Sequence, residues 1–532
     1  MSRHRWLIAW GLTLIAGIAL RVYQIGDQII ADDEWHALRM VSLFGYAEIF
    51  TTFGVADHCI PLTLLYEWLS RNGALSEWAM RAPMMVAGVS AIVLIPIAFR
   101  PWLNARERWL LGAMIALWPI LIYYSRTARP YALLFLLAGA AIPLAYQWWY
   151  QKKRKSGVFY GVGVVLAGWM NPLTLALGLS PLLWFSGSAI RSAIVLRQRA
   201  PMLRLLRFGL PVAASLALLI GPPLLNDWSS LTGKAGTDQA GLETIIVFWQ
   251  LFSGSRGWPV AVVVLVLTAV GSFELAKRDR RFLGFLSFCV SLAAVTVWLT
   301  EAAWINHALV LARYLLPTLA LVLALAALGC YRVLGLIGIP KVPQTVSAGL
   351  LVLAHWVEGP VPEAYAGRNQ FTGHMRYQFD YVLERNPYNV LETIELNPVF
   401  SKVGENFAPG ETTVILAPWF HEWHFNLAYR FQHVHRQPMK MAFVQGLCAD
   451  DRAGEFPPEP GGLDFRHFTH LSAMLREPVA GAVLTLRRSK PYWAPETRWP
   501  ENWEGCLSKI EELLGVPWYQ DAEFIAYRFD AD

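Results

Sequence analysis

Charged residues are scarce in this sequence. They make up 16% of its 532 residues, against about 25% in ordinary soluble domains, so an ordinary soluble protein is excluded. The net charge of +6 does not indicate nucleic acid, because the basic residues lie in short loops between apolar runs. Walker motifs, dinucleotide-binding glycine motifs, internal repeats and low-complexity runs are all absent from the sequence.

Long apolar runs are what the sequence has instead. They recur from Trp6 to about Val357 and then stop. A hydrocarbon core of about 30 Å needs ~20 apolar residues for one helical crossing, so we predict a polytopic α-helical membrane protein with about eleven transmembrane helices. The predicted spans are residues 6–25, 81–99, 109–124, 131–150, 157–170, 173–190, 208–226, 259–276, 282–300, 314–331 and 345–357.

Basic residues favour alternate loops between these spans, as in QKKRK at 151–155 and KRDRR at 277–281. The positive-inside rule therefore predicts a cytoplasmic N-terminus and an extracytoplasmic tail. We expect residues 1–357 to form a transmembrane domain with a large first outer loop at 26–80. Residues 358–532 would form a second, soluble domain outside the membrane.

The tail and the outer loops show patterns of their own. Buried-strand and helix patterns alternate in the tail and predict an α/β domain. The outer loops predict amphipathic helices at the membrane surface, and a flexible Gly/Ser/Thr-rich stretch in the second loop is typical of a lid. The tail segments are strands at 412–418, 481–488 and 523–529 and helices at 465–477 and 506–515; the loop helices are a helix capped by Asp32, one at 61–75 and one at 242–252.

Four polar clusters, far apart in the sequence, fall at the outer face of the predicted topology. Their acids are Asp32, Asp33, Glu34 and Asp57, and their permanent cations are Arg126, Arg129 and Arg313. Arginine binds phosphate through a planar fork, and a carboxylate beside such cations stays ionised and can act as a general base. Acids in a first helical turn also serve as caps, and arginines at span ends also contact lipid headgroups. The grouping at one face favours a site for a lipid-phosphate donor.

These residues resemble motifs of the polyprenyl-phosphate-dependent glycosyltransferases of the protein O-mannosyltransferase-like family, which includes the transferase that adds aminoarabinose to lipid A. The likeness covers most of residues 1–330. Its four motifs are Asp33-Glu34, DHCIPLTLLYEWLSRNGALSEWAMRAP at 57–83, SRTARPYALL at 125–134 and Arg-Tyr-Leu-Leu-Pro at 313–317. The chain departs from the family at Cys59-Ile60, where His-Pro-Pro is expected, and the extra Asp32 leaves the identity of the base open.

The resemblance implies a GT-C fold in a bacterial inner or plasma membrane. It implies an inverting transfer of one sugar from a polyprenyl-phosphate donor to an extracytoplasmic lipid, glycan or protein. Asp33 is then the first candidate for the base, assisted by Glu34 or Asp57, and the candidates for the donor phosphate are His58, Arg126, Arg129 and Arg313. Some related folds hold a divalent metal at such acids, and oxygen ligands suit Mg²⁺ or Mn²⁺. The arginines can neutralise phosphate unaided, so a metal stays unassigned.

Three alternatives remain. A transporter or flippase of lipid-linked sugars needs polar residues at mid-span depth, where Asn171 is the clearest example. A polysaccharide polymerase or ligase shares the outer-face arginines but gives no reason for the Asp-Glu pair. Tail histidines at 421, 424, 433 and 435 suggest zinc, but their spacing is not the zincin pattern, and we interpret them as surface or acceptor-contact residues. Cys448 and Cys506 lie where a disulfide can persist, although spacing alone does not pair them.

Overall fold

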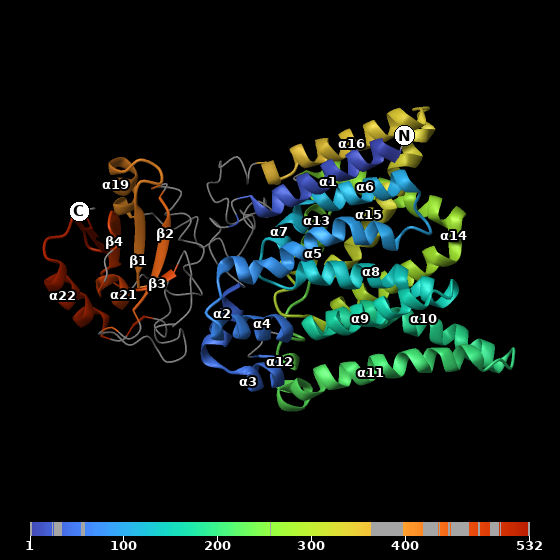
Figure 1. The fold of residues 1–532 in the computed structure, drawn as a ribbon, viewed down its shortest axis with the longest axis horizontal. Coiled ribbons are helices and arrows are strands. Elements are labelled where there is room, and N and C mark those ends of the chain that lie inside the picture. Colours follow the sequence, from blue (N-terminus) through green and yellow to red (C-terminus); the bar gives the residue numbers. More distant parts are fainter. Residues whose placement is uncertain are drawn as a thin grey trace.

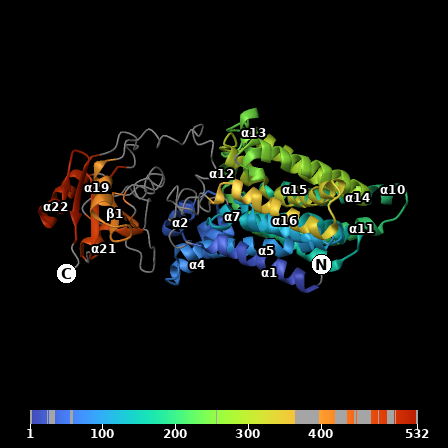
Figure 2. The same ribbon diagram turned by 90° about the horizontal axis from the view of Figure 1, so that it is seen from above.

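The computed structural model describes most of the helical region and the strands of the tail. The described residues are 3–23, 25, 34–54, 59–255, 257–362, 397–418, 435, 437–444, 447, 468–476, 479–489, 499–500 and 502–529. The structure confirms a polytopic α-helical membrane protein that ends in a smaller α/β part. The long helices run roughly side by side in a bundle, and the sheet lies beyond the end of the bundle that carries the short helices (Figures 1 and 2).

Each predicted span falls on a helix of the bundle. Among the described residues, length and hydropathy alone support six crossing helices, or seven if the bent pair α6 (Ala105–Leu117) and α7 (Pro119–Ser125) counts as one span, so the expected number of eleven is not confirmed by this criterion. One reason is that α14, although kinked, counts as one helix and carries two predicted spans. The helices are α1 (Arg3–Val22), α5 (Glu77–Ala98), α6 (Ala105–Leu117), α7 (Pro119–Ser125), α8 (Tyr131–Tyr150), α9 (Arg154–Met170), α10 (Thr174–Ile194), α11 (Ala200–Asn226), α14 (Trp258–Thr300), α15 (Ala308–Leu336) and α16 (Lys341–Glu358).

Helical geometry in α14 is interrupted at Asp279, which has φ −156° and ψ 85°. The Asp279 carboxylate accepts hydrogen bonds from the backbone N–H of Phe282 at 2.9 Å and from Trp102 Nε1 at 3.1 Å. It therefore caps the second half of α14 as an N-cap residue caps a helix. This break falls within the KRDRR segment that separates the two predicted spans.

The break between α6 and α7 brings the turn at 126–130 to the end of α1. Trp118 is extended and Pro119 has no N–H, so carbonyls at the end of α6 lack intrahelical donors. The fully buried guanidinium of Arg21 in α1 replaces them, donating to Ala116 O at 3.0 Å and Ile115 O at 3.1 Å. Arg21 Nε also donates to Ser125 Oγ at 3.0 Å, at the last residue of α7.

Short helices cover the end of the bundle that faces the sheet (Figure 1). The predicted amphipathic stretch at 61–75 is confirmed as α4 (Ile60–Arg71), and the helix expected after Asp32 is α2 (Glu34–Leu43). Between them α3 (Tyr46–Thr51) packs Ile49 with Phe53 against Ile220 of α11. The segment between α11 and α14 forms α12 (Trp228–Thr232) and α13 (Leu242–Ser253), the latter at the predicted position 242–252.

The described part of the tail contains a six-stranded sheet in the order β3-β2-β1-β4-β6-β5. The first four strands are parallel, and β6 is antiparallel to both β4 and β5. The predicted strands are confirmed as β1 (Thr413–Ala417), β4 (Ala482–Arg487) and β6 (Phe524–Arg528), and the helix at 506–515 as α22 (Trp503–Leu514). The predicted helix at 465–477 is partly wrong, because β3 (Phe468–His470) precedes α21 (Leu471–Arg476). The sheet also contains β2 (Met439–Phe443) and β5 (Tyr519–Gln520), and α19 (Pro398–Asn406) precedes it.

Candidate functional site

Glu34 lies in a buried ion pair and not in an open site. Arg81 of α5 donates to both of its carboxylate oxygens, from Nε to Oε1 at 3.0 Å and from Nη2 to Oε2 at 2.9 Å. The backbone N–H of Ala128 donates to Oε1 at 2.6 Å. Both charged side chains are almost completely buried. The pair therefore joins the start of α2 to α5 and to the turn that carries the two predicted arginines, Arg126 and Arg129.

Arg126 is also engaged with the protein itself. Its side chain is fully buried, and Nη1 donates to Tyr23 O at 2.7 Å and, at longer distances, to Leu20 O and Arg21 O. These carbonyls belong to the last turn of α1 and to the residue that follows it, where no further helical N–H groups are available to satisfy them. Arg126 therefore caps the C-terminal end of α1. Its binding to a donor phosphate stays a prediction.

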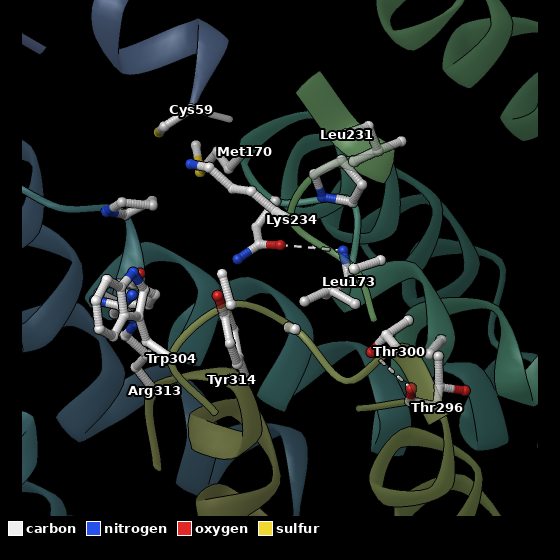
Figure 3. Close-up of a pocket in the computed structure, with 18 of the residues that line it drawn as sticks. Cys59, Met170, Leu173, Leu231, Lys234, Thr296, Thr300, Trp304, Arg313 and Tyr314 are labelled. Atoms are coloured by element: carbon white, nitrogen blue, oxygen red, sulfur yellow. Dashed lines mark hydrogen bonds between the residues drawn. The ribbon is translucent and has the colours of Figure 1, made fainter. Parts of the chain in front are cut away.

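Arg129 and Arg313 line a cavity of about 530 Å³ at the end of the bundle that carries the short helices. Lys234, which the sequence reading did not select, lines it as well, and Figure 3 shows Lys234 and Arg313 on different sides. In the sequence, Lys234 is a lone lysine in a Gly/Ser/Thr-rich stretch, and no motif marks it. The remaining wall is largely apolar or aromatic: Pro130, Tyr131, Met170, Pro172, Leu173, Ala176, Trp228, Leu231, Ala235, Ala302, Ala303, Trp304 and Tyr314.

Aromatic rings surround the cationic part of this cavity. The Arg313 guanidinium carbon lies 5.6 Å from the ring centroid of Tyr131 and 5.6 Å from that of Tyr314, within the range of cation–π attraction. Tyr66 lies near Arg129 and Arg81, and its hydroxyl donates to Met80 O at 3.0 Å. Burial raises the pKa of Tyr66 well above its usual value, so Tyr66 keeps its proton.

The loop that carries Lys234 and the loop between α14 and α15 are hydrogen-bonded together along one wall of the cavity. Ala303 N donates to Lys234 O at 2.8 Å, and Gly236 N donates to Thr300 O at 3.0 Å. The loop that carries Lys234 is also held to the segment between α3 and α4, because Gly54 N donates to Asp227 Oδ2 at 2.7 Å. Slight burial acts to raise the pKa of Asp227, but hydrogen bonds from Gly54 and Ser230 outweigh it and lower that pKa, so Asp227 stays ionised.

Several predicted residues lie outside the described part of the chain. They are Asp32, Asp33, Asp57, His58, His421, His424, His433 and Cys448. His36, which follows the acidic cluster, lines the cavity. In the tail, His435 is fully buried, and burial lowers its pKa to about 3, so it stays neutral. Cys506 is disulfide-bonded, whereas Cys59, Cys289 and Cys330 do not form disulfides.

Comparison with known proteins finds no matching family model and no matching curated protein. Among solved structures, ArnT from Cupriavidus metallidurans is similar over 99% of this chain and 98% of its own. The form bound to undecaprenyl phosphate is 12% identical with a TM-score of 0.42, and the apo form is 13% identical with a TM-score of 0.45. The archaeal oligosaccharyltransferase AglB from Archaeoglobus fulgidus, in complex with an inhibitory peptide and a dolichol-phosphate, is similar over 82% of this chain and 64% of its own, at 12% identity and a TM-score of 0.42.

Proposed function

We propose that this chain is a membrane glycosyltransferase that moves a sugar from a polyprenyl-phosphate donor to an extracytoplasmic acceptor. The cavity supports this most, because it combines the cations Arg129, Lys234 and Arg313 with an apolar wall. A polyprenyl-phosphate sugar has the same two characters, an anionic phosphate and an apolar chain. The described residues that line the cavity include no Asp or Glu, so none of them opposes a bound anion.

The chemistry follows from the charges that change during transfer. An acceptor oxygen or nitrogen forms a bond to C1 of the sugar as the bond from C1 to the phosphate oxygen breaks. The acceptor loses its proton to a carboxylate base, and the phosphate gains negative charge as it leaves. Arginine and lysine side chains that face this phosphate stabilise the transition state more than the donor, which raises the rate of the chemical step. A single backside displacement of this kind inverts the configuration at C1.

The contacts refine the roles expected of individual residues. Asp33 remains our first choice for the base, with Asp57 assisting and His58 near the phosphate. Glu34 is reassigned as a positioning residue, because its carboxylate is already paired with Arg81. Arg126 likewise positions the end of α1. If Mg²⁺ or Mn²⁺ takes part, the carboxylates of Asp33 and Asp57 are the ones to hold it, since these cations prefer oxygen ligands.

The donor-binding part of this proposal predicts a graded loss of transfer. Hydrogen bonds to charged groups contribute about 1.5–3 kcal/mol each, so Arg129→Ala, Lys234→Ala or Arg313→Ala should each weaken transfer about ten- to a hundredfold. Arg313→Lys should retain part of the activity, because lysine keeps the charge but loses the planar fork. The measurement is transfer kinetics of the purified chain with a short-chain polyprenyl-phosphate sugar.

The control for these variants is Arg207→Ala, at an exposed arginine of α11 that does not line the cavity. It should behave like the wild type. If the three cavity variants also keep wild-type kinetics, the cations only anchor the chain to lipid, and the transferase loses its chemical basis. A chain that moves the lipid-linked sugar between leaflets of vesicles without transferring it would support a flippase instead.

The proposed topology has a cytoplasmic N-terminus and a tail domain, residues 358–532, outside the membrane. The disulfide at Cys506 supports this placement, because disulfides persist in oxidising compartments and are rare in the cytosol. A reporter protein that is active only in the cytoplasm, fused after Asp532, should therefore be silent in cells. The same reporter fused in the 151–155 loop should be active, and a bright signal from the Asp532 fusion would contradict the topology.

A further inference from the structure

Trp304 lines the cavity in an unusual backbone conformation. It lies in the loop between α14 and α15 and has a φ of 66°, in the left-handed region that bulky side chains rarely adopt. Such conformations persist where the surrounding structure holds them, and they cluster at ligand-binding sites. The surrounding structure therefore holds Trp304 in a conformation that tryptophan disfavours, which makes Trp304 a candidate for a role in ligand binding.

Hydrogen bonds to the second outer loop hold this backbone in place. The N–H of Trp304 donates to Asp238 Oδ2 at 2.7 Å, and Asn306 Nδ2 donates to Asp238 Oδ1 at 3.3 Å. The neighbouring N–H of Ala303 donates to Lys234 O. These hydrogen bonds thus fix the backbone of Trp304 beside the loop that carries Lys234.

The indole of Trp304 is 54% exposed although it is a large apolar group. Figure 3 draws it on the same side of the cavity as Arg313, which the proposed function assigns to the donor phosphate. In a sugar phosphodiester the ring is joined to the phosphate through a single oxygen at C1. A sugar held at this phosphate must therefore lie within a few ångströms of it, next to the wall that Trp304 supplies.

We propose that Trp304 is a stacking surface for the transferred sugar, an inference that rests on the proposed function. One face of a sugar ring presents C–H groups, which pack on a flat indole. Its hydroxyl groups project from the rim and stay free for polar partners or water. Asp238 is then a positioning residue. It holds the Trp304 backbone, and it is not among the described residues that line the cavity.

The test compares two ligands on the purified full-length chain: a short-chain polyprenyl phosphate and the same lipid carrying its sugar. The main variant is Trp304→Asn, because asparagine tolerates the left-handed backbone but has no aromatic face. It should weaken binding of the sugar-bearing lipid about five- to tenfold and leave binding of the bare lipid unchanged. Trp304→Phe keeps a flat ring and should retain most of the preference for the sugar-bearing lipid.

Two controls separate this role from simpler ones. Trp258→Asn removes a tryptophan that is 44% exposed and does not line the described cavity; it should leave both affinities unchanged if the outer tryptophans merely contact lipid. Asp238→Asn should reproduce part of the Trp304→Asn effect on the sugar-bearing lipid.

Equal weakening of both ligands by Trp304→Asn, or no weakening of either, would overturn the stacking role. A wild-type chain that fails to bind even the bare lipid would instead overturn the proposed function. Arg313→Ala should weaken binding of both ligands in the same assay, because both carry the phosphate. Trp304→Asn should weaken binding of the sugar-bearing lipid alone.

Discussion

Asp33→Asn should lower the rate of sugar transfer by about a hundred- to ten-thousandfold, the usual contribution of a positioned general base. Asparagine has nearly the same shape as aspartate but cannot take a proton from the acceptor. Asp33 is preferred over Glu34 because the Glu34 carboxylate already accepts three hydrogen bonds, two from Arg81 and one from Ala128. Initial rates with a short-chain donor, at matched amounts of membrane-inserted protein, measure the effect.

Asp32→Asn is the matched control for this prediction, because it removes the same charge one residue earlier. It should keep most of the activity and should insert into the membrane to the same extent as Asp33→Asn. Near-normal transfer by Asp33→Asn together with loss in Asp32→Asn would move the role of base to Asp32. Loss of folded protein in Asp33→Asn would show that this acid is structural, like Glu34.

Arg81→Met should be the most damaging of these substitutions for stability. It leaves the Glu34 carboxylate buried without its cation, and breaking a buried ion pair from one side costs about 3–5 kcal/mol. The penalty is large here because both side chains are almost fully buried at the junction of α2, α5 and the turn after α7. We expect a much lower yield of folded protein and a clear fall in the melting temperature of the detergent-solubilised chain.

The double variant Arg81→Met with Glu34→Gln should recover part of this loss. Glutamine removes the unpaired charge, and its side-chain oxygen can still accept the hydrogen bond from Ala128 N. Arg71→Ala is the control, since it breaks the Arg71–Glu67 pair, whose arginine is 57% exposed, and exposed pairs contribute little. A melting temperature that is unchanged in Arg81→Met would show that Glu34 is neutral or solvated in the native protein.

The sequence alone determined the class of the protein and the ends of many of its elements. Apolar runs of membrane length place a helix at each predicted span, because helices alone satisfy their backbone within the bilayer along a single segment. Local patterns were also sufficient for α4, α22 and strands such as β1, whose hydrophobic period is complete within a few residues. The strand β3 was missed because it has only three residues and lies at the edge of the sheet, where it pairs with β2. The strand β2 was missed because Lys440 interrupts its short apolar run.

The roles of the charged residues were decided only by the tertiary structure. Glu34 and Arg126 looked equivalent in the sequence to other acids and arginines at the outer face, yet both are buried against partners from distant segments. Lys234 and Trp304 carried no motif, and they reach the cavity because two loops are hydrogen-bonded together. A sequence pattern records what a residue can do, whereas the free energy of burying a charge depends on which partner the fold brings to it.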